Sequence, residues 1–194
     1  MEISIDVVKQ LREATGLSVM QCRKALEEAG GDIEKAEVIL RKRSSEAADK
    51  KSDREIGAGA VGMYLHDKAI GAMVLLSSET DFVSKNPEFE ALARELAMQV
   101  AATNPQYLSS EEIDQAAKDA AMAVFKEEVK DKPADMQEKI LAGKMDSYFR
   151  DSVLLNQPYI KDESKSIKQL IDEASQKFGE RVEISKFARF SARG

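Results

Sequence analysis

The 194-residue sequence contains no tryptophan, one cysteine and one histidine. A single thiol, Cys22, cannot form a disulfide within the chain, so we expect a reducing compartment, the cytoplasm. Cys22 falls on an apolar helix face, which favours a packed thiol over a nucleophile. The histidine, His66, lies in YLHDKAIG, which is typical of a hairpin turn rather than of a catalytic base.

Sequence motifs for cofactors and metals are absent as well. The chain has no Walker loop, no GxGxxG fingerprint and no Cys/His spacing suited to a metal. No apolar run approaches the roughly 20 residues of a membrane helix, and MEISIDVVKQLREATG lacks the pattern of a secretory signal. The net charge of -6 argues against general nucleic-acid binding. We therefore expect no catalytic residue, cofactor, metal, nucleic acid or membrane, and a protein as the partner.

Residues 1–43 predict a compact module of three helices. Each helix has a residue suited to cap its N-terminus: Ser4, Ser18 and Asp32. Gly16 and a later Gly-Gly pair end the first two helices, and Gln21 completes a capping box in the second. So small a bundle buries little core, which favours a docking module over an independent machine.

The second helix begins with two apolar residues whose environment is ambiguous. Val19 and Met20 occupy its first turn, and polar Arg12 lies nearby on the first helix. Met20 suits a core position as well as an exposed contact, so both interpretations stay open.

A charged segment follows the module. RKRSSEAADKKSDREIG, Arg41 to Gly57, has no apolar stripe, and it predicts a solvated helical extension or a linker. We expect a charged linker at residues 44–56 and a core domain at residues 57–194.

Three segments predict an antiparallel sheet. GAGAVGMYLH alternates apolar and small residues, and AIGAMVLLS is apolar on both faces. A hairpin with both faces buried cannot be the whole sheet, so RVEISKFARF is expected as a third strand. One face of that strand is expected to carry Val182, Ile184, Ala188 and Phe190. Phe187 breaks the alternation and is expected on the other face.

The stretch from about residue 109 to 150 predicts a projecting helical hairpin. Ser109 and Glu112 match a capping box, KDKP is the turn, and Pro133 begins the returning helix. A last helix, Ser166 to Phe178, is expected before the third strand. The three-stranded sheet, the helices packed on it and the hairpin together predict an α+β fold.

The motif TDFV, Thr80 to Val83, lies between the second strand and a helix that Asn86 caps. It places the carboxylate of Asp81 beside the large aromatic ring of Phe82, at a turn where water should reach both. Two interpretations are open. Either Phe82 is exposed and contacts a partner, or it packs under its own helix as a hydrophobic staple while Asp81 caps that helix.

Three stretches together resemble the bacterial elongation factor Ts family. LREATGLSVMQCRKALEEAGGDIEKAEVILRKR is similar to that family's N-terminal module, which has a ubiquitin-associated-like three-helix fold. TDFVSKN is similar to its signature loop, and AMQVAATNPQYL and QPYIKDESKSIKQL are similar to later parts of its core. The resemblance spans nearly the whole chain.

This resemblance implies guanine nucleotide exchange on elongation factor Tu, a translational GTPase. It implies that Phe82 wedges into that GTPase beside its magnesium site. The residues of the same matching loop are Thr80, Asp81, Phe82 and Val83. In the N-terminal module, the residues that match the family's partner contacts are Arg12, Val19 and Met20.

Many members of the family carry two core subdomains in one chain, whereas this chain has room for one. It resembles the short form, which makes up the second half by forming a homodimer. The sequence supports this independently, because a sheet that is apolar on both faces can take helices on one side and a second subunit on the other. We thus expect residues 57–194 to form the exchange-factor core and the dimer contact.

Other function classes fit parts of the sequence. A ubiquitin-fold-binding adaptor with a dimerising core accounts for the three-helix module but gives TDFV no role. An RNA-binding factor is suggested only by RKRSSEAADKK, where acids are interleaved with the basic residues. A metabolic enzyme has no support, because no catalytic constellation is present.

Overall fold

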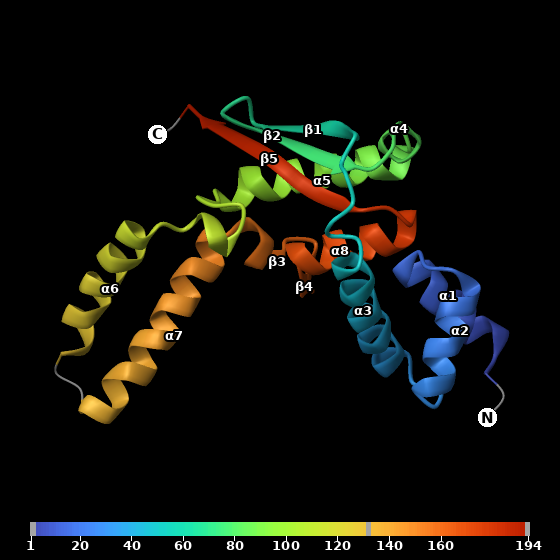
Figure 1. Cartoon of the computed structure of the whole chain (residues 1–194), viewed down its shortest axis with the longest axis horizontal. Coiled ribbons are helices and arrows are strands. Elements are labelled where there is room, and N and C mark those ends of the chain that lie inside the picture. Colours follow the sequence, from blue (N-terminus) through green and yellow to red (C-terminus); the bar gives the residue numbers. More distant parts are fainter. Residues whose placement is uncertain (1–2, 131–132, 193–194) are drawn as a thin grey trace.

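The computed structural model describes residues 3–130 and 133–192 (Figure 1). Its α-helices are α1 (Ile5–Thr15), α2 (Val19–Glu28), α3 (Ile33–Asp49), α4 (Asp81–Ser84), α5 (Pro87–Thr103), α6 (Gln115–Val129), α7 (Ala134–Ser152) and α8 (Ile167–Phe178). Its strands are β1 (Ala58–His66), β2 (Ile70–Ser78), β3 (Pro158–Tyr159), β4 (Asp162–Ser166) and β5 (Val182–Ser191). A three-stranded antiparallel sheet packs against helices, which confirms the predicted α+β class.

The first three helices form the predicted module, and its predicted caps are present. The side chains of Ser4, Ser18 and Asp32 each accept a backbone hydrogen bond from the first turn of α1, α2 and α3. Gln21 completes the capping box, and Gly16 ends α1 in the left-handed conformation, with φ of 67°. An apolar cluster of its own fills the module: Val8, Leu11, Leu17, Cys22, Ala25, Leu26, Ala36 and Leu40.

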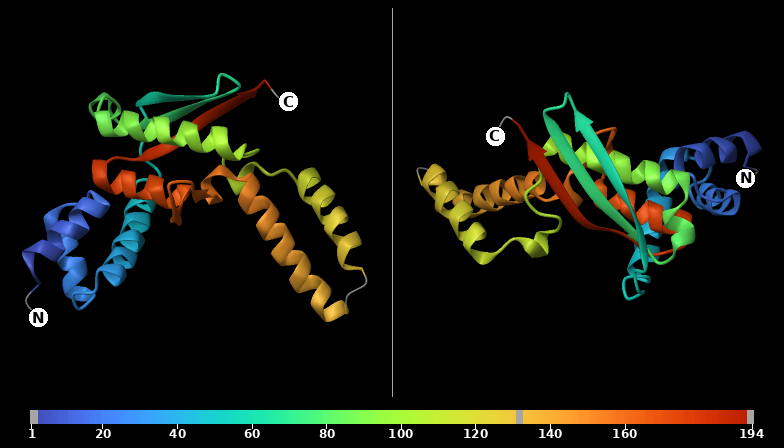
Figure 2. Two further views of the ribbon diagram at one scale, coloured as in Figure 1. Left: turned by 180° about the vertical axis from the view of Figure 1, so that it is seen from behind. Right: turned by 90° about the horizontal axis from the view of Figure 1, so that it is seen from above.

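The main sheet has the strand order β1-β2-β5, with antiparallel neighbours. The predicted turn joins β1 to β2 directly after His66, where Asp67 and Lys68 have positive φ values of 47° and 57°. Helix α5 lies across one face of the sheet, and α8 lies on the same side (Figures 1 and 2). The core therefore sits between one face of the sheet and these two helices.

Helix α5 approaches β1 so closely that no side chain fits between them. A Cβ atom placed on Gly62 would lie 2.0 Å from the carbonyl oxygen of Ala93 and 2.1 Å from its carbonyl carbon. Glycine is required here by the close approach of two backbones. Buried side chains of α5 fill the rest of the interface: Phe89, Ala93, Leu96, Ala97 and Val100.

Strand β5 contains a β-bulge that the alternation of its residues did not predict. The register shifts at Ser185, which is not paired with any residue of β2. The expectation that Val182 and Ile184 share a face with Ala188 and Phe190 is therefore wrong, because the extra residue reverses the alternation. The α5 face carries Val182, Ile184, Phe187 and Arg189, and the opposite face carries Lys186, Ala188 and Phe190.

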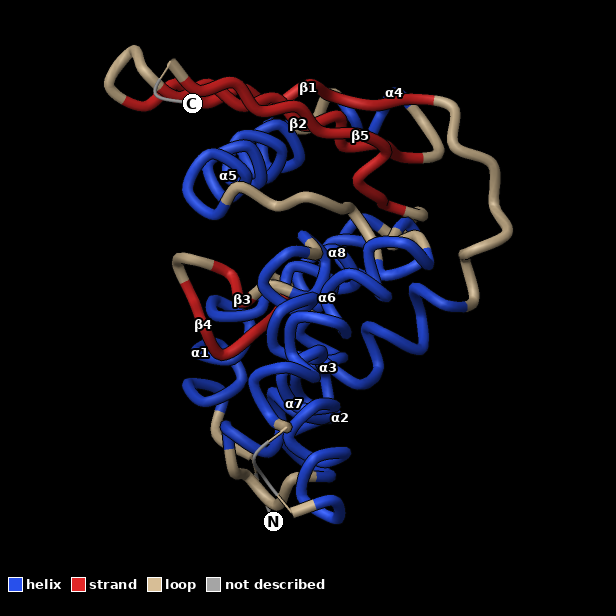
Figure 3. The backbone as a smooth tube through the Cα atoms, turned by 90° about the vertical axis from the view of Figure 1, so that its left-hand side faces the viewer, coloured by secondary structure: helices blue, strands red, loops and turns tan. Residues whose placement is uncertain are grey.

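The opposite face of the sheet, which we call the open face, carries exposed apolar side chains. Its large members are Val61, Met63, Leu65, Met73, Leu75 and Phe190. The strand register places Val61 opposite Leu75 and Met63 opposite Met73, so these side chains are neighbours. The long helices of the described chain lie on the other side of the sheet (Figure 3). An apolar surface of this extent is typical of an interaction site.

Helix α3 continues beyond the predicted module and packs along α8. It runs to Asp49, so the helical alternative holds for the first part of the charged segment. Ser44 is fully buried, and Ser45 Oγ donates to Asp172 Oδ2 over 2.6 Å. The expectation that this segment is solvated is wrong for Ser44, because small serine side chains let α3 and α8 come close. The division into module, linker and core stays a prediction.

Helices α6 and α7 form the predicted hairpin, which projects from the core away from the three-helix module (Figures 1 and 2). Pro133 directly precedes α7, as expected. Two residues of the predicted KDKP turn, 131 and 132, lie outside the described residues. The two helices pack mainly on each other, with Phe125 of α6 in an edge-to-face contact with Tyr148 of α7.

The capping box expected at Ser109 is wrong. Ser109 precedes only a short 3-10 turn and makes no capping bond with its side chain. Glu112 instead accepts a hydrogen bond from the Leu108 amide over 2.7 Å. Helix α6 begins later, where Asp114 accepts a bond from the Ala117 amide over 2.6 Å.

The small hairpin of β3 and β4 was not predicted. Gln99 of α5 is fully buried, donates to the Gln157 side chain over 3.1 Å and accepts a bond from the Ile160 amide over 2.9 Å. The Tyr159 hydroxyl donates to Glu95 over 2.6 Å, and burial together with this bond raises the pKa of Tyr159. Polar side chains therefore hold this hairpin, so no apolar pattern predicted it.

Replacing Gly62 by alanine should destabilise the core by about 1–3 kcal/mol, because the new methyl group overlaps the Ala93 carbonyl. Thermal and urea unfolding of Gly62→Ala measure the change. The control is Gly143→Ala in α7, where an added Cβ meets nothing within 4 Å. That change should leave stability equal or raise it by up to about 1 kcal/mol. Equal stability of the parent and Gly62→Ala would contradict the close packing.

Candidate functional site

The TDFV loop occupies a sharp turn between β2 and α5. Strand β2 ends at Ser78, α4 is a single turn, and Asn86 caps α5 by accepting a bond from the Glu88 amide over 2.9 Å. Val83 is buried at 4% exposure, whereas Phe82 is 84% exposed. The alternative that Phe82 packs under its own helix is therefore wrong.

Asp81 is an exposed carboxylate beside that ring. It begins α4, and its Oδ2 lies 2.6 Å from the Lys85 Nζ one turn later. The hydrogen bond from Lys85 holds the pKa of Asp81 below its usual value, so the group is ionised at neutral pH. Because both side chains are exposed, this pair contributes little to stability and leaves Asp81 free to exchange Lys85 for a partner group.

Thr80 ties the loop to the connection between α8 and β5. Its amide donates to Glu180 Oε2 over 3.0 Å and its hydroxyl donates to Glu180 Oε1 over 2.6 Å. A third bond joins the same two segments, with the donor now in the connection between α8 and β5. The Arg181 amide donates to Glu79 Oε1 over 2.6 Å, and this bond holds the pKa of Glu79 below its usual value. We call these three bonds the loop clamp. Glu180 was not predicted from the sequence, because its partner lies 100 residues earlier in the chain.

The three residues predicted for the N-terminal module are all exposed. Val19 is 55% exposed and Met20 is 68% exposed in the first turn of α2, so the core interpretation of Met20 is wrong. Arg12 is exposed in the last turn of α1. Helices α1, α2 and α4 lie toward the same end of the long axis of the molecule, with α4 beside the sheet (Figures 1 and 2). One partner could therefore reach both the module and the TDFV loop.

Cys22 and His66, for which we expect no catalytic role, both have structural surroundings. Cys22 has no exposed surface, which confirms the packed thiol, and His66 lies at the hairpin turn. Within the described residues, no group of three His, Cys, Asp or Glu side chains could hold a metal ion. None of the described helices has both the length and the apolar character needed to cross a membrane.

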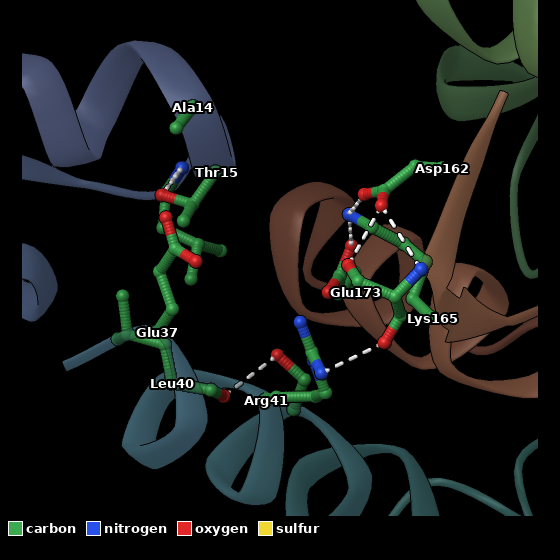
Figure 4. A pocket seen from close by; sticks show the side chains of 11 residues that line it. Ala14, Thr15, Glu37, Leu40, Arg41, Asp162, Lys165 and Glu173 are labelled. Atoms are coloured by element: carbon green, nitrogen blue, oxygen red, sulfur yellow. Dashed lines mark hydrogen bonds and ion pairs between the residues drawn. The ribbon is translucent and has the colours of Figure 1, made fainter. Parts of the chain in front are cut away.

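A pocket of about 130 Å³ lies between the module and the core, lined by α1, α3, β4 and α8 (Figure 4). Its lysine is paired with two of its carboxylates, while Arg41 Nε is buried without a hydrogen-bond partner among the described residues. Lys165 Nζ lies 3.0 Å from Glu173 and 3.5 Å from Asp162, and Arg41 donates to the Ser164 carbonyl over 3.1 Å. This pocket is a polar contact region between the three-helix module and the core.

Comparison with known proteins assigns the family. The sequence profile described as Elongation factor TS matches residues 31–193. The chain is 45% identical to an Elongation factor Ts of Thermodesulfovibrio yellowstonii over 191 residues, which cover 98% of this chain and 96% of that protein. It is 43% identical to that of Thermotoga petrophila, with the same coverage, and 45% identical to that of Leptospira biflexa across the full length of both. The chain therefore belongs to the elongation factor Ts family of translation elongation factors.

Proposed function

We propose that this protein is a guanine nucleotide exchange factor for elongation factor Tu and acts in the cytoplasm, where translation runs. It acts without a catalytic residue, cofactor or metal ion of its own. The observation that carries the proposal is the exposure of Phe82, at 84%, at the apex of a turn whose next residue is buried. Membership of the elongation factor Ts family supports the same activity.

The proposed mechanism disturbs the magnesium site of the GTPase. A bound Mg²⁺ holds a nucleotide by neutralising phosphate charge, and it requires near-octahedral geometry. Phe82 enters beside this site and displaces the groups that support the ion. Burying a phenylalanine removes roughly 150–250 Å² from water, which contributes about 2–3 kcal/mol. That free energy offsets part of the disruption of the nucleotide site.

Binding linkage explains both release and recycling. The factor must bind the nucleotide-free GTPase more tightly than the loaded one, because only a difference in affinity can shift the equilibrium. Nucleotide must then weaken the factor by the same ratio. The factor speeds GDP release and is expelled when the GTPase reloads, so it needs no nucleotide pocket.

The other residues of the loop and of the module have separate roles in this proposal. Asp81 supplies an exposed charge for polar contacts with the partner, while Thr80 and Val83 hold the loop. Exposed residues of the N-terminal module supply affinity: Arg12, Val19 and Met20.

We also propose that the open face binds the same face of a second copy to form a homodimer. The face carries exposed apolar side chains on all three strands, and helices already cover the other side of the sheet. Two such sheets can pack face to face at a spacing of about 10 Å. The resemblance to the short form of the family, which forms a homodimer, supports the same pairing here.

The exchange activity is tested by Phe82→Ala. Losing the wedge should lower the rate of GDP release from elongation factor Tu by about 30-fold or more, the equivalent of 2–3 kcal/mol. Release of a fluorescent GDP analogue measures the rate, and Val124→Ala, an exposed apolar change on α6, is the control. An unchanged rate with an unchanged melting temperature would contradict the mechanism. Binding of a ubiquitin-fold protein without any exchange would instead favour the adaptor.

The role of the module is tested by replacing Val19 and Met20 together with alanine. This change should raise the factor concentration needed for half-maximal exchange by about 30-fold, because two apolar contacts of roughly 1 kcal/mol each are lost. The maximal rate should not change, since the wedge is intact. Val38→Ala, another exposed apolar change in the module, is the control. A lower maximal rate at unchanged half-saturation would refute this division of roles.

The homodimer is tested by Met63→Lys, which puts a charge beside Met73 on the open face. Burying that charge without a partner is unfavourable, so the variant should sediment as a monomer at micromolar concentration while the parent sediments as a dimer. Met136→Lys, at an exposed methionine of α7, should leave the dimer intact. A parent chain that sediments as a monomer would exclude the dimer.

A further inference from the structure

The loop clamp fixes the position at which α4 begins. Only Glu79 and Thr80 connect the end of β2 to α4, and both belong to the clamp. Glu180 uses both carboxylate oxygens on Thr80, one for the amide and one for the hydroxyl. Hydrogen bonds to an ionised acceptor are shorter and stronger than neutral ones, and a two-point contact also fixes orientation.

Thr80 makes this contact instead of the usual local one. A threonine at the N-cap position normally accepts a bond from the first turn of its helix. Thr80 occupies the N-cap of α4 with extended φ and ψ of -127° and 158°, yet makes no capping bond with its side chain. Its hydroxyl donates a hydrogen bond to Glu180 instead. The bond therefore holds α4 against the core rather than stabilising the helical turn itself.

Two fixed points thus flank the exposed ring. On one side of Phe82 the clamp holds Thr80, and on the other side Val83 is buried in the core cluster. Arg54, from the connection between α3 and β1, reinforces the first point by donating to Glu79 over 3.1 Å. The Arg181 guanidinium donates in turn to the Arg54 carbonyl over 2.6 Å.

We propose that Glu180 is a positioning residue for nucleotide exchange, which acts on the partner only through Phe82. This inference rests on the exchange function proposed above. Glu180 holds Thr80 from a different part of the chain and thereby sets the direction in which the ring leaves the core. Without it, Phe82 is still present and exposed but reaches the partner's magnesium site in fewer encounters.

The experiment measures GDP release with Glu180→Ala, Glu180→Gln and a control, Glu163→Ala, which removes an exposed carboxylate of β4. Glu180→Ala should lower the maximal rate by about tenfold while the affinity for the nucleotide-free GTPase changes little. Glu180→Gln keeps an acceptor for the Thr80 amide and should retain an intermediate rate. Glu163→Ala should match the parent.

A double variant shows whether Glu180 acts through the ring. In the Phe82→Ala background, Glu180→Ala should have no further effect on the rate, since the group it positions is gone. An equal loss in both backgrounds would overturn the proposal. So would an affinity loss as large as the loss of rate.

Folding of the variants is checked by thermal unfolding. If Glu180→Ala does not fold, Thr80→Val tests the same clamp, because it removes only the hydroxyl bond. A parent-like maximal rate for a folded clamp variant would overturn the positioning role. If Phe82→Ala slows exchange in that same series, the proposed function stands while the clamp proposal fails.

Discussion

The backbone contact between Gly62 and Ala93 is the constraint on which the arrangement of the core depends. Because no side chain separates β1 from α5 there, the helix lies directly on the sheet and begins close to the end of β2. The connection, residues 79–86, then reverses direction and includes the single helical turn α4. That turn buries Val83 and leaves Phe82 in water. The exposed aromatic ring is thus a consequence of how the core packs.

Features encoded by neighbouring residues could be predicted from the sequence, and those that depend on distant residues could not. The caps at Ser4 and Ser18 were predicted correctly because cap and helix are adjacent in the chain. Ser109 offered a local capping pattern, but the residues just before it accept backbone bonds from the segment that follows α7, and α6 begins only after Asp114. The bulge at Ser185 was missed because only pairing with β2 shows which residue is extra.

The candidate site shows the same limit. The motif and its turn were found from residue types alone, but both orientations of Phe82 satisfied the local pattern, and burial of its neighbour in the core decided between them. Glu180 carried no signal, because a glutamate after a helix-ending glycine is unremarkable until Thr80 is placed beside it. The resemblance to the elongation factor Ts family supplied the partner, which no single residue encodes.

The enclosure of the lone thiol has a practical consequence. Cys22 is sealed inside the three-helix module, with its sulfur 3.7 Å from the Thr15 hydroxyl oxygen. A thiol reagent reaches it only when that module opens, and the core contains no thiol that would report separately. The labelling rate of the unmodified chain therefore reports the local opening of the three-helix module, without an engineered reporter.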